Sequence, residues 1–119
     1  MGKWLGENGY LLDLNIGWNH IRKNAALAVA KGVSDNNKLL KINLSWNGFG
    51  NEGAVALGKA LAHNVMLEEL DIRSNRIGPH GFVALFSCFK ENNTLKKIAV
   101  KILINFKNIN HSFMNIYVY

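Results

Sequence analysis

The 119-residue sequence predicts an α/β solenoid, with parallel strands on one side and helices on the other. The first observation is that Asn19, Asn47 and Asn75 recur with a 28-residue period, because 47 − 19 and 75 − 47 are both 28. The second is that leucine or isoleucine precedes each asparagine at the same alternating positions. The third is that an apolar pattern with helical spacing follows each asparagine. A repeat of this size cannot bury its own apolar side, so the units bury it against their neighbours.

A short strand is expected in front of each asparagine. Its alternating apolar side chains point into the solenoid, and the residues between them point outward. The recurring positions are Leu11, Leu14, Ile16, Asn19 and Ile21; Leu39, Ile42, Leu44, Asn47 and Phe49; and Leu67, Leu70, Ile72, Asn75 and Ile77. Their spacing, L-x-x-L-x-L-x-x-N-x-L, is that of leucine-rich repeats.

A helix is expected in the second half of each unit, because four further columns recur at offsets that share one helix face. The columns are Ala28, Ala56 and Ala84; Val29, Leu57 and Leu85; Gly32, Ala60 and Cys88; and Val33, Leu61 and Phe89. Asn36, Asn64 and Asn92 follow the helices, in the turn back to the next strand. Pro79 suits an early helical position, where no backbone donor is missed.

The sequence closely resembles the ribonuclease-inhibitor-like subfamily of leucine-rich repeats. The signature is N-G-F-G-N-E-G-A-V-A-L-G-K-A-L at 47–61, echoed by N-R-I-G-P-H-G-F-V-A-L at 75–85, and the resemblance covers roughly residues 1–100. It implies a right-handed leucine-rich-repeat solenoid, a horseshoe fragment with a parallel β-sheet on the concave face and α-helices on the convex face. Members include ribonuclease inhibitors, activators of a nuclear-transport GTPase and the sensing arms of innate-immune receptors. The resemblance therefore implies protein binding, or regulation of another enzyme.

We expect a single domain that ends in a divergent tail. The expected parts are a partial repeat at 1–10, complete repeats at 11–38, 39–66 and 67–94, the start of a fourth at 95, and a non-repeat tail at 101–119. Leu103 stands where the next asparagine is due. Lys, Asn, Ile, Phe, Tyr and Met fill 15 of the 19 tail positions. These residues have A/T-rich codons, so the tail is either read from intronic or frame-shifted DNA or a divergent C-terminal cap. The first alternative makes the chain a truncated isoform without independent function.

The charge and the termini favour a cytoplasmic protein. The formal net charge is +6, but residues 1–100 hold 12 basic and 8 acidic groups, a net of +4. The basic residues are scattered over turns, helices and strand, which indicates a solvated surface and no nucleic-acid partner. Residues 1–10 lack the apolar stretch of a secretory signal, and the apolar run at 98–106 is too short to span a bilayer. We therefore expect no membrane partner.

The sequence predicts a non-enzymatic protein with no cofactor, no metal and no small-molecule substrate. His20, His63, His80 and His111 occupy unrelated positions, and there is no phosphate loop of the G-x-x-x-x-G-K type. Cys88 shares its column with Gly32 and Ala60, so a buried small side chain is favoured over a reactive thiol.

The outward columns of the strands are the predicted partner-binding surface. The first column alternates in charge: Asp13, Lys41, Glu69 and Lys97. Its charges either pair between neighbouring strands or bind a partner that intercalates among them. The predicted partner-binding residues on the concave face are Asp13, Asn15, Trp18, Lys41, Asn43, Trp46, Glu69, Asp71 and Arg73.

Two columns need separate interpretations. Trp18 and Trp46 share a column with Ser74, and they belong either to an interface or to packing over the strand-to-helix turn. The asparagine ladder of Asn19, Asn47 and Asn75 is expected to be structural, because a carboxamide can both donate to and accept from the backbone of the turn.

Overall fold

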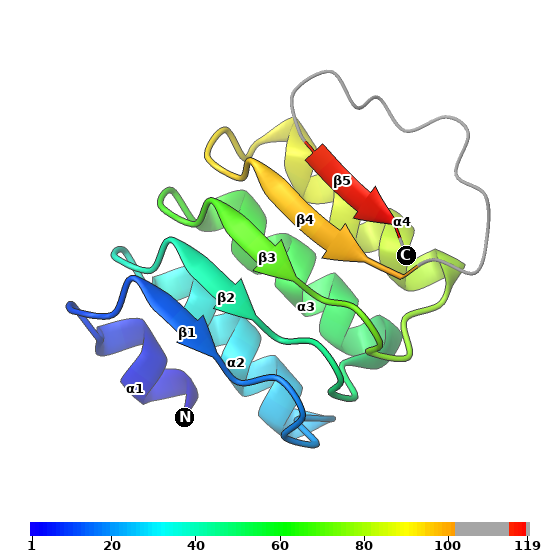
Figure 1. Cartoon of the computed structure of the whole chain (residues 1–119), viewed down its shortest axis with the longest axis horizontal. Coiled ribbons are helices and arrows are strands. Elements are labelled where there is room, and N and C mark those ends of the chain that lie inside the picture. Colours follow the sequence, from blue (N-terminus) through cyan, green and yellow to red (C-terminus); the bar gives the residue numbers. More distant parts are fainter. Residues whose placement is uncertain (102–114, 119) are drawn as a thin grey trace.

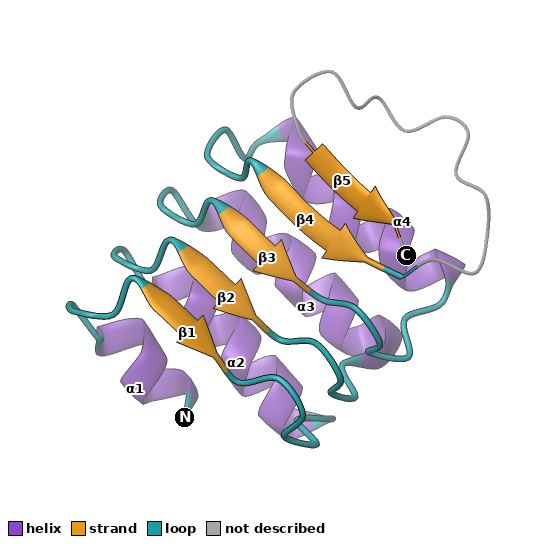
Figure 2. Cartoon of the chain, viewed as in Figure 1, coloured by secondary structure: helices purple, strands orange, loops and turns teal. Residues whose placement is uncertain are grey.

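The computed structural model describes residues 1–101 and 115–118, and they form two layers, one of strands and one of helices (Figure 1). The helices lie side by side along one face of the sheet (Figure 2). The elements in chain order are α1 (Gly2–Glu7), β1 (Asp13–Asn15), α2 (Asn24–Asp35), β2 (Lys41–Asn43), α3 (Gly50–His63), β3 (Glu69–Asp71), α4 (Pro79–Phe86), a 3-10 turn (Ser87–Lys90), β4 (Lys97–Val100) and β5 (Asn115–Val118). The predicted α/β solenoid is confirmed.

The sheet register follows the sequence period. Strands β1 to β4 pair in parallel, and Leu14 lies opposite Ile42, Ile42 opposite Leu70, and Leu70 opposite Ile98. Each step equals the 28-residue period, so equivalent residues of successive units lie in rows across the sheet. Every outward column predicted from the sequence is therefore a row of neighbours in space.

The predicted tail contributes a fifth strand that the sequence analysis did not anticipate. Strand β5 pairs in parallel with β4 and places Ile116 opposite Ile98, so this step (116 − 98) falls short of the period. The position of Leu103, where the sequence predicts the end of the asparagine row, lies outside the described residues. So does His111.

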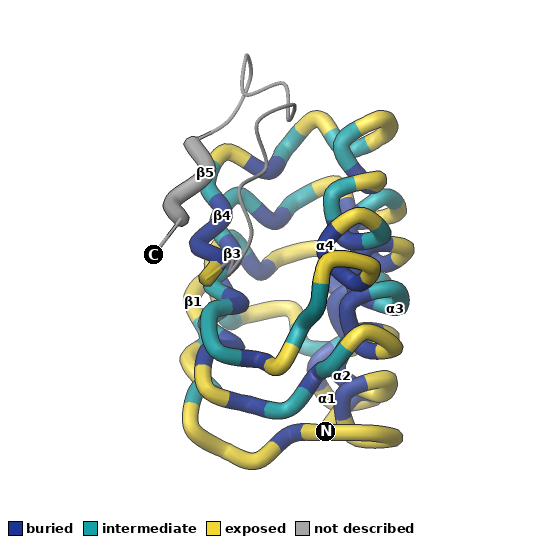
Figure 3. The backbone as a smooth tube through the Cα atoms, turned by 90° about the vertical axis from the view of Figure 1, so that its right-hand side faces the viewer, coloured by how far each residue is buried: buried dark blue, intermediate teal, exposed yellow. Residues whose placement is uncertain are grey.

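The apolar core lies between the two layers, where the dark blue segments of strand and helix face each other (Figure 3). The largest fully buried side chains are Leu5, Val29, Val33, Leu39, Leu44, Leu57, Leu61, Leu67, Leu70, Ile72, Leu85 and Ile98. Every described unit contributes to this one cluster, as expected for repeats that bury their apolar side against one another.

The sequence analysis misplaced one helix column. Ala28 is exposed, and Ala56 and Ala84 are half-buried. The buried small column lies two positions earlier, at Ala26 and Ala54. A helix on a sheet buries residues three and four apart, so Ala26 joins the stripe that continues through Val29 and Val33.

A second row of asparagines, Asn36, Asn64 and Asn92, joins the ends of successive helices; we call it the return-turn ladder. Asn64 Nδ2 donates to Val33 O at 2.8 Å and to Asn36 O at 3.0 Å. Asn64 Oδ1 accepts from Met66 N at 2.9 Å and from Leu67 N at 2.7 Å. Asn36 and Asn92 make the same four bonds at their own positions. Each side chain thus joins one unit to the next through buried backbone groups.

Neighbouring helices approach closely at glycine. A Cβ added to Gly58 of α3 would lie 2.5 Å from the carbonyl oxygen of Ala84 in α4. That distance is well inside van der Waals contact, and the obstacle is backbone, which cannot rotate away. The absence of a side chain at Gly58 therefore sets how closely α3 and α4 pack.

We predict that Asn36→Ala destabilises the fold by on the order of 3 kcal/mol, because four backbone groups lose their partner in two buried and two part-buried hydrogen bonds. Asn37→Ala is the matched control, since the adjacent Asn37 is exposed and its loss should change stability by less than about 0.5 kcal/mol. Urea denaturation measures both. Equal midpoints for the two variants would contradict a joining role for the return-turn ladder.

We predict that Gly58→Ala destabilises by roughly 1 to 3 kcal/mol, because the added methyl forces α3 and α4 apart. The sign is diagnostic, since the same change in an unobstructed helix interior stabilises by about 1 kcal/mol. Gly9→Ala, where an added Cβ meets nothing within 4 Å, is the control. Thermal unfolding followed by circular dichroism measures both, and a Gly58→Ala chain as stable as the parent would refute the close contact.

Candidate functional site

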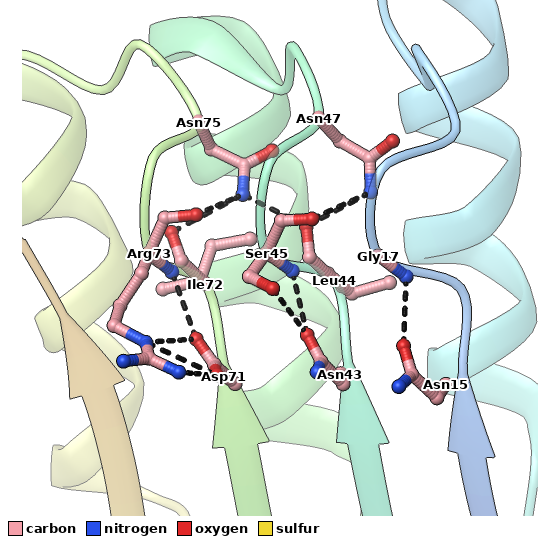
Figure 4. Close-up of polar contacts among 10 residues, drawn as sticks. All are labelled: Asn15, Gly17, Asn43, Leu44, Ser45, Asn47, Asp71, Ile72, Arg73 and Asn75. Atoms are coloured by element: carbon pink, nitrogen blue, oxygen red, sulfur yellow. Dashed lines mark hydrogen bonds and ion pairs between the residues drawn. The ribbon is translucent and has the colours of Figure 1, made fainter.

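The carboxyl ends of the strands are held by the predicted asparagine ladder (Figure 4). Asn47 Nδ2 donates to Ile16 O at 3.0 Å and to Leu44 O at 2.9 Å, and its Oδ1 accepts from Asn19 N and Ile21 N. Asn75 makes three of these four bonds one unit later: its Nδ2 donates to Leu44 O and Ile72 O, and its Oδ1 accepts from Phe49 N. Both side chains are buried, at 7% and 2% exposure. They fix the turn from which the outward side chains project.

Asn19, the first residue of the ladder, differs from the other two. Its side chain is exposed, and its Nδ2 donates to Gly17 O at 2.8 Å within its own unit. Unlike Asn47 and Asn75, it forms no side-chain bond to an earlier unit within the part of the chain that the structure describes.

Six of the nine predicted partner-binding residues line one hollow of about 330 Å³ on the concave face of the sheet, which we call the concave hollow. These six are Asp13, Lys41, Asn43, Glu69, Asp71 and Arg73, with Ile42, Leu70, Lys97 and Ala99 completing the lining. Asn15 is exposed nearby but does not line the hollow. The concave hollow therefore presents charges of both signs from four successive strands.

Some of the charged side chains that line the concave hollow form ion pairs with one another. Lys41 Nζ lies 3.7 Å from Glu69 Oε1, and both side chains are more than a third exposed, so the pair contributes at most about 1 kcal/mol. Arg73 donates through Nε and Nη2 to both carboxylate oxygens of Asp71, at 2.7 to 3.1 Å. No ion pair joins Asp13 to Lys41 in the described ranges, so the Asp13 carboxylate faces solvent.

The second outward column has a local role that the sequence analysis missed. Asn15, Asn43 and Asp71 each accept, through Oδ1, from the backbone N–H two residues ahead, at 2.9 to 3.1 Å (Figure 4). Asparagine and aspartate often close a chain turn in this way. These Oδ1 atoms are thus already bonded, whereas the side-chain amide nitrogens of Asn15 and Asn43 form no hydrogen bond among the residues that the structure describes.

Trp18 and Trp46 lie apart from the concave hollow, beyond the carboxyl ends of β1 and β2. Their rings stack, with centroids 4.2 Å apart and planes 11° from parallel. They remain 69% and 49% exposed. With Ser74 they line a second hollow of about 370 Å³, which we call the tryptophan edge. The rings pack on each other while leaving a large apolar area in solvent.

The tryptophan edge includes residues that the sequence analysis did not select. His20, Arg22, Gly48 and Arg76 line it beside the two rings. His20, Gly48 and Arg76 follow the same 28-residue period, so the period would have identified this row. It was missed because its members differ so much in chemistry.

The metal-ligating and nucleophilic side chains of the described residues are dispersed. None of them forms a cluster of three histidine, cysteine or carboxylate side chains able to hold a metal. Cys88 is buried, as predicted, and burial raises the pKa of its thiol from the usual 9.0 to about 12. The thiol therefore stays protonated at neutral pH. None of the described helices is both long enough and apolar enough to cross a bilayer.

Comparisons with known proteins agree with the repeat pattern. A family model described as "Leucine Rich repeat" matches residues 35–58 and 63–86, two segments whose starts are one 28-residue period apart. The solved structure described as "Leiomodin-1 Actin-Binding Site 2 (ABS2)" superposes with a TM-score of 0.83 and 16% sequence identity, over 99% of this chain and 76% of that one. No curated protein sequence matches significantly. The two matched repeats and the superposition show that the chain has the α/β solenoid fold of leucine-rich repeats.

We predict that stability falls as pH rises above 9.0, because an unfolded Cys88 releases its proton there while the folded thiol holds it until about pH 12. One such group gives a slope of at most about 1.4 kcal/mol per pH unit. Urea midpoints on either side of pH 9.0 measure the slope. Cys88→Ala is the control, since Ala60 fills the equivalent position and the other titrating groups are shared. Identical slopes for the two chains would contradict a protonated buried thiol.

Proposed function

We propose that this protein is a non-enzymatic interaction module that binds a protein partner along the concave hollow. The observation on which this rests is the gathering of charged and polar side chains from four neighbouring strands around one hollow. Solenoids use such extended concave surfaces for binding. The alternating signs of Asp13, Lys41, Glu69 and Lys97 favour a partner with the complementary alternation and disfavour others.

We also propose that the protein belongs to the ribonuclease-inhibitor-like subfamily and lies in the cytoplasm. The 28-residue unit, with full helices of 12 residues in α2 and 14 in α3, supports placement in the ribonuclease-inhibitor-like subfamily. The single, buried cysteine supports a reducing compartment, which we take to be the cytoplasm. Neither assignment changes the binding surface.

Actin is a defined first probe, because the similar leiomodin-1 structure is described as an actin-binding site. The likeness to that structure concerns the fold, so actin is tested beside partners captured without bias from a cell extract. Each captured protein is then purified, and its affinity for the intact chain is measured.

We predict that exchanging the charges of Lys41 and Glu69, by Lys41→Glu with Glu69→Lys, weakens partner binding by about tenfold or more. The exchange keeps the net charge and an opposite-charge pair while inverting the field that a partner meets. The affinity is measured by titration of labelled partner, and circular dichroism verifies the fold.

The matched control exchanges Lys31 and Asp35, an exposed ion pair on α2, by Lys31→Asp with Asp35→Lys. This control exchanges a basic and an acidic side chain on the helical face in place of the concave face, and it should leave the affinity for the partner unchanged. If both exchanges weaken binding equally, or neither does, the concave hollow is not the partner site and the proposal is wrong.

A further inference from the structure

The tryptophan row is left open at one end. Trp18, Trp46 and Ser74 occupy equivalent positions after β1, β2 and β3, and Trp46 stands between the other two. Because Trp18 stacks on one side of Trp46, the other face of that indole is directed along the row toward Ser74. Serine has no ring to continue the stack, and Ser74 lines the same hollow as both tryptophans. The stack therefore ends at Trp46, and Ser74 adds no third ring to the row.

Basic side chains surround this open position. His20, Arg22 and Arg76 line the tryptophan edge, and all three are exposed. No carboxylate lines it, and none of the three basic groups forms an ion pair within residues 1–101 and 115–118. The edge is thus positive and aromatic, in contrast to the mixed charges of the concave hollow.

Gly48 makes room for one of these cations. Arg22 and Gly48 pair across the turn, and a Cβ at Gly48 would lie 3.0 Å from Arg22 Cβ. The missing side chain lets Arg22 lie close against the neighbouring unit, at the tryptophan edge.

The backbone at the edge is held in an unfavourable conformation. Trp18 has φ of 60° and Trp46 has φ of 56°, in the left-handed region that large side chains rarely adopt. His20 and Arg76 are left-handed as well, at 53° and 58°. Ser74 is left-handed as well, at 56°, so the fold imposes this turn in all three units and thereby fixes the direction in which the two indoles project.

Building on the proposed function, we propose that the tryptophan edge binds an acidic peptide segment of the partner through one aromatic residue flanked by aspartate or glutamate. The partner ring stacks on Trp46 above Ser74, and its neighbouring carboxylates pair with Arg22 and Arg76. Stacked aromatic rings beside charge-assisted hydrogen bonds are a strong combination for recognition.

A peptide fits this surface better than a single-stranded nucleic acid. The row offers the free face of a single indole, that of Trp46, whereas single strands bind by stacking successive bases along a positive groove. The adjacent concave hollow is lined by three basic and three acidic side chains, so it offers no net attraction to a phosphate backbone that continued past the edge.

The test begins with a random peptide library displayed on phage and selected on the intact chain. We expect enriched peptides to contain an aromatic residue next to aspartate or glutamate. A selected peptide is then synthesised with a fluorescent label, and its affinity is measured by anisotropy beside a labelled oligouridylate. Ser74→Trp, which fills the open position, and Arg22→Glu with Arg76→Glu should each weaken the peptide by about tenfold or more.

Trp46→Ala is a second variant that removes the stacking face without adding bulk, and the Lys31 and Asp35 exchange on α2 should leave the affinity unchanged. The inference would be overturned if no peptide were enriched, or if the selected peptides lacked aromatic residues. It would also be overturned if oligouridylate bound more tightly than the peptide, or if these variants did not alter the affinity for the peptide. A further comparison uses the whole partner. If the Ser74→Trp chain still binds it, but the chain with Lys41 and Glu69 exchanged does not, this inference alone is refuted. The reverse pattern would refute the concave-hollow proposal alone.

Discussion

The bonding of asparagine carboxamides across the boundary between repeats is the interaction on which the structure depends. A carboxamide presents two donors and an acceptor with two lone pairs, which matches the unpaired backbone groups on either side of a turn. Asn64 bonds Val33 and Asn36 behind it and Met66 and Leu67 ahead of it. At the other end of the strand, Asn47 bonds Leu44 in its own unit and Ile16, Asn19 and Ile21 in the unit before it. With both ends fixed, a three-residue strand keeps its register although its ladder is short.

The fold was predictable because its determinants are local and periodic. The 28-residue spacing of one residue type defined the register, and the alternation around Leu14, Ile42 and Leu70 defined the inner face. The helix stripe was harder, since alanine is common on both sides of a helix; Ala28 was chosen where Ala26 is buried. Strand β5 joins the sheet at a shorter offset than the period, so no argument from the period could have found it.

The sequence predicted which residues line the candidate site better than it predicted which of them bond to each other. Rows across the sheet follow directly from the period, so the residues of the concave hollow could be named from the sequence. Which charges pair within a unit could not, because Asp71 and Arg73 meet through side-chain rotation that no spacing specifies. The same holds for the separation of Trp18 and Trp46 from the concave hollow, which follows from a left-handed turn at each tryptophan.

The two asparagine rows also explain how such a chain can grow. Each junction is self-contained, since Asn36, Asn64 and Asn92 reach no further than the adjacent unit and make the same four bonds each time. An in-frame duplication of one unit therefore creates a boundary that already has every polar partner it needs. A gene encoding this architecture can lengthen by whole copies with these carboxamide bonds kept, whereas a partial copy would leave a carboxamide facing the wrong carbonyls.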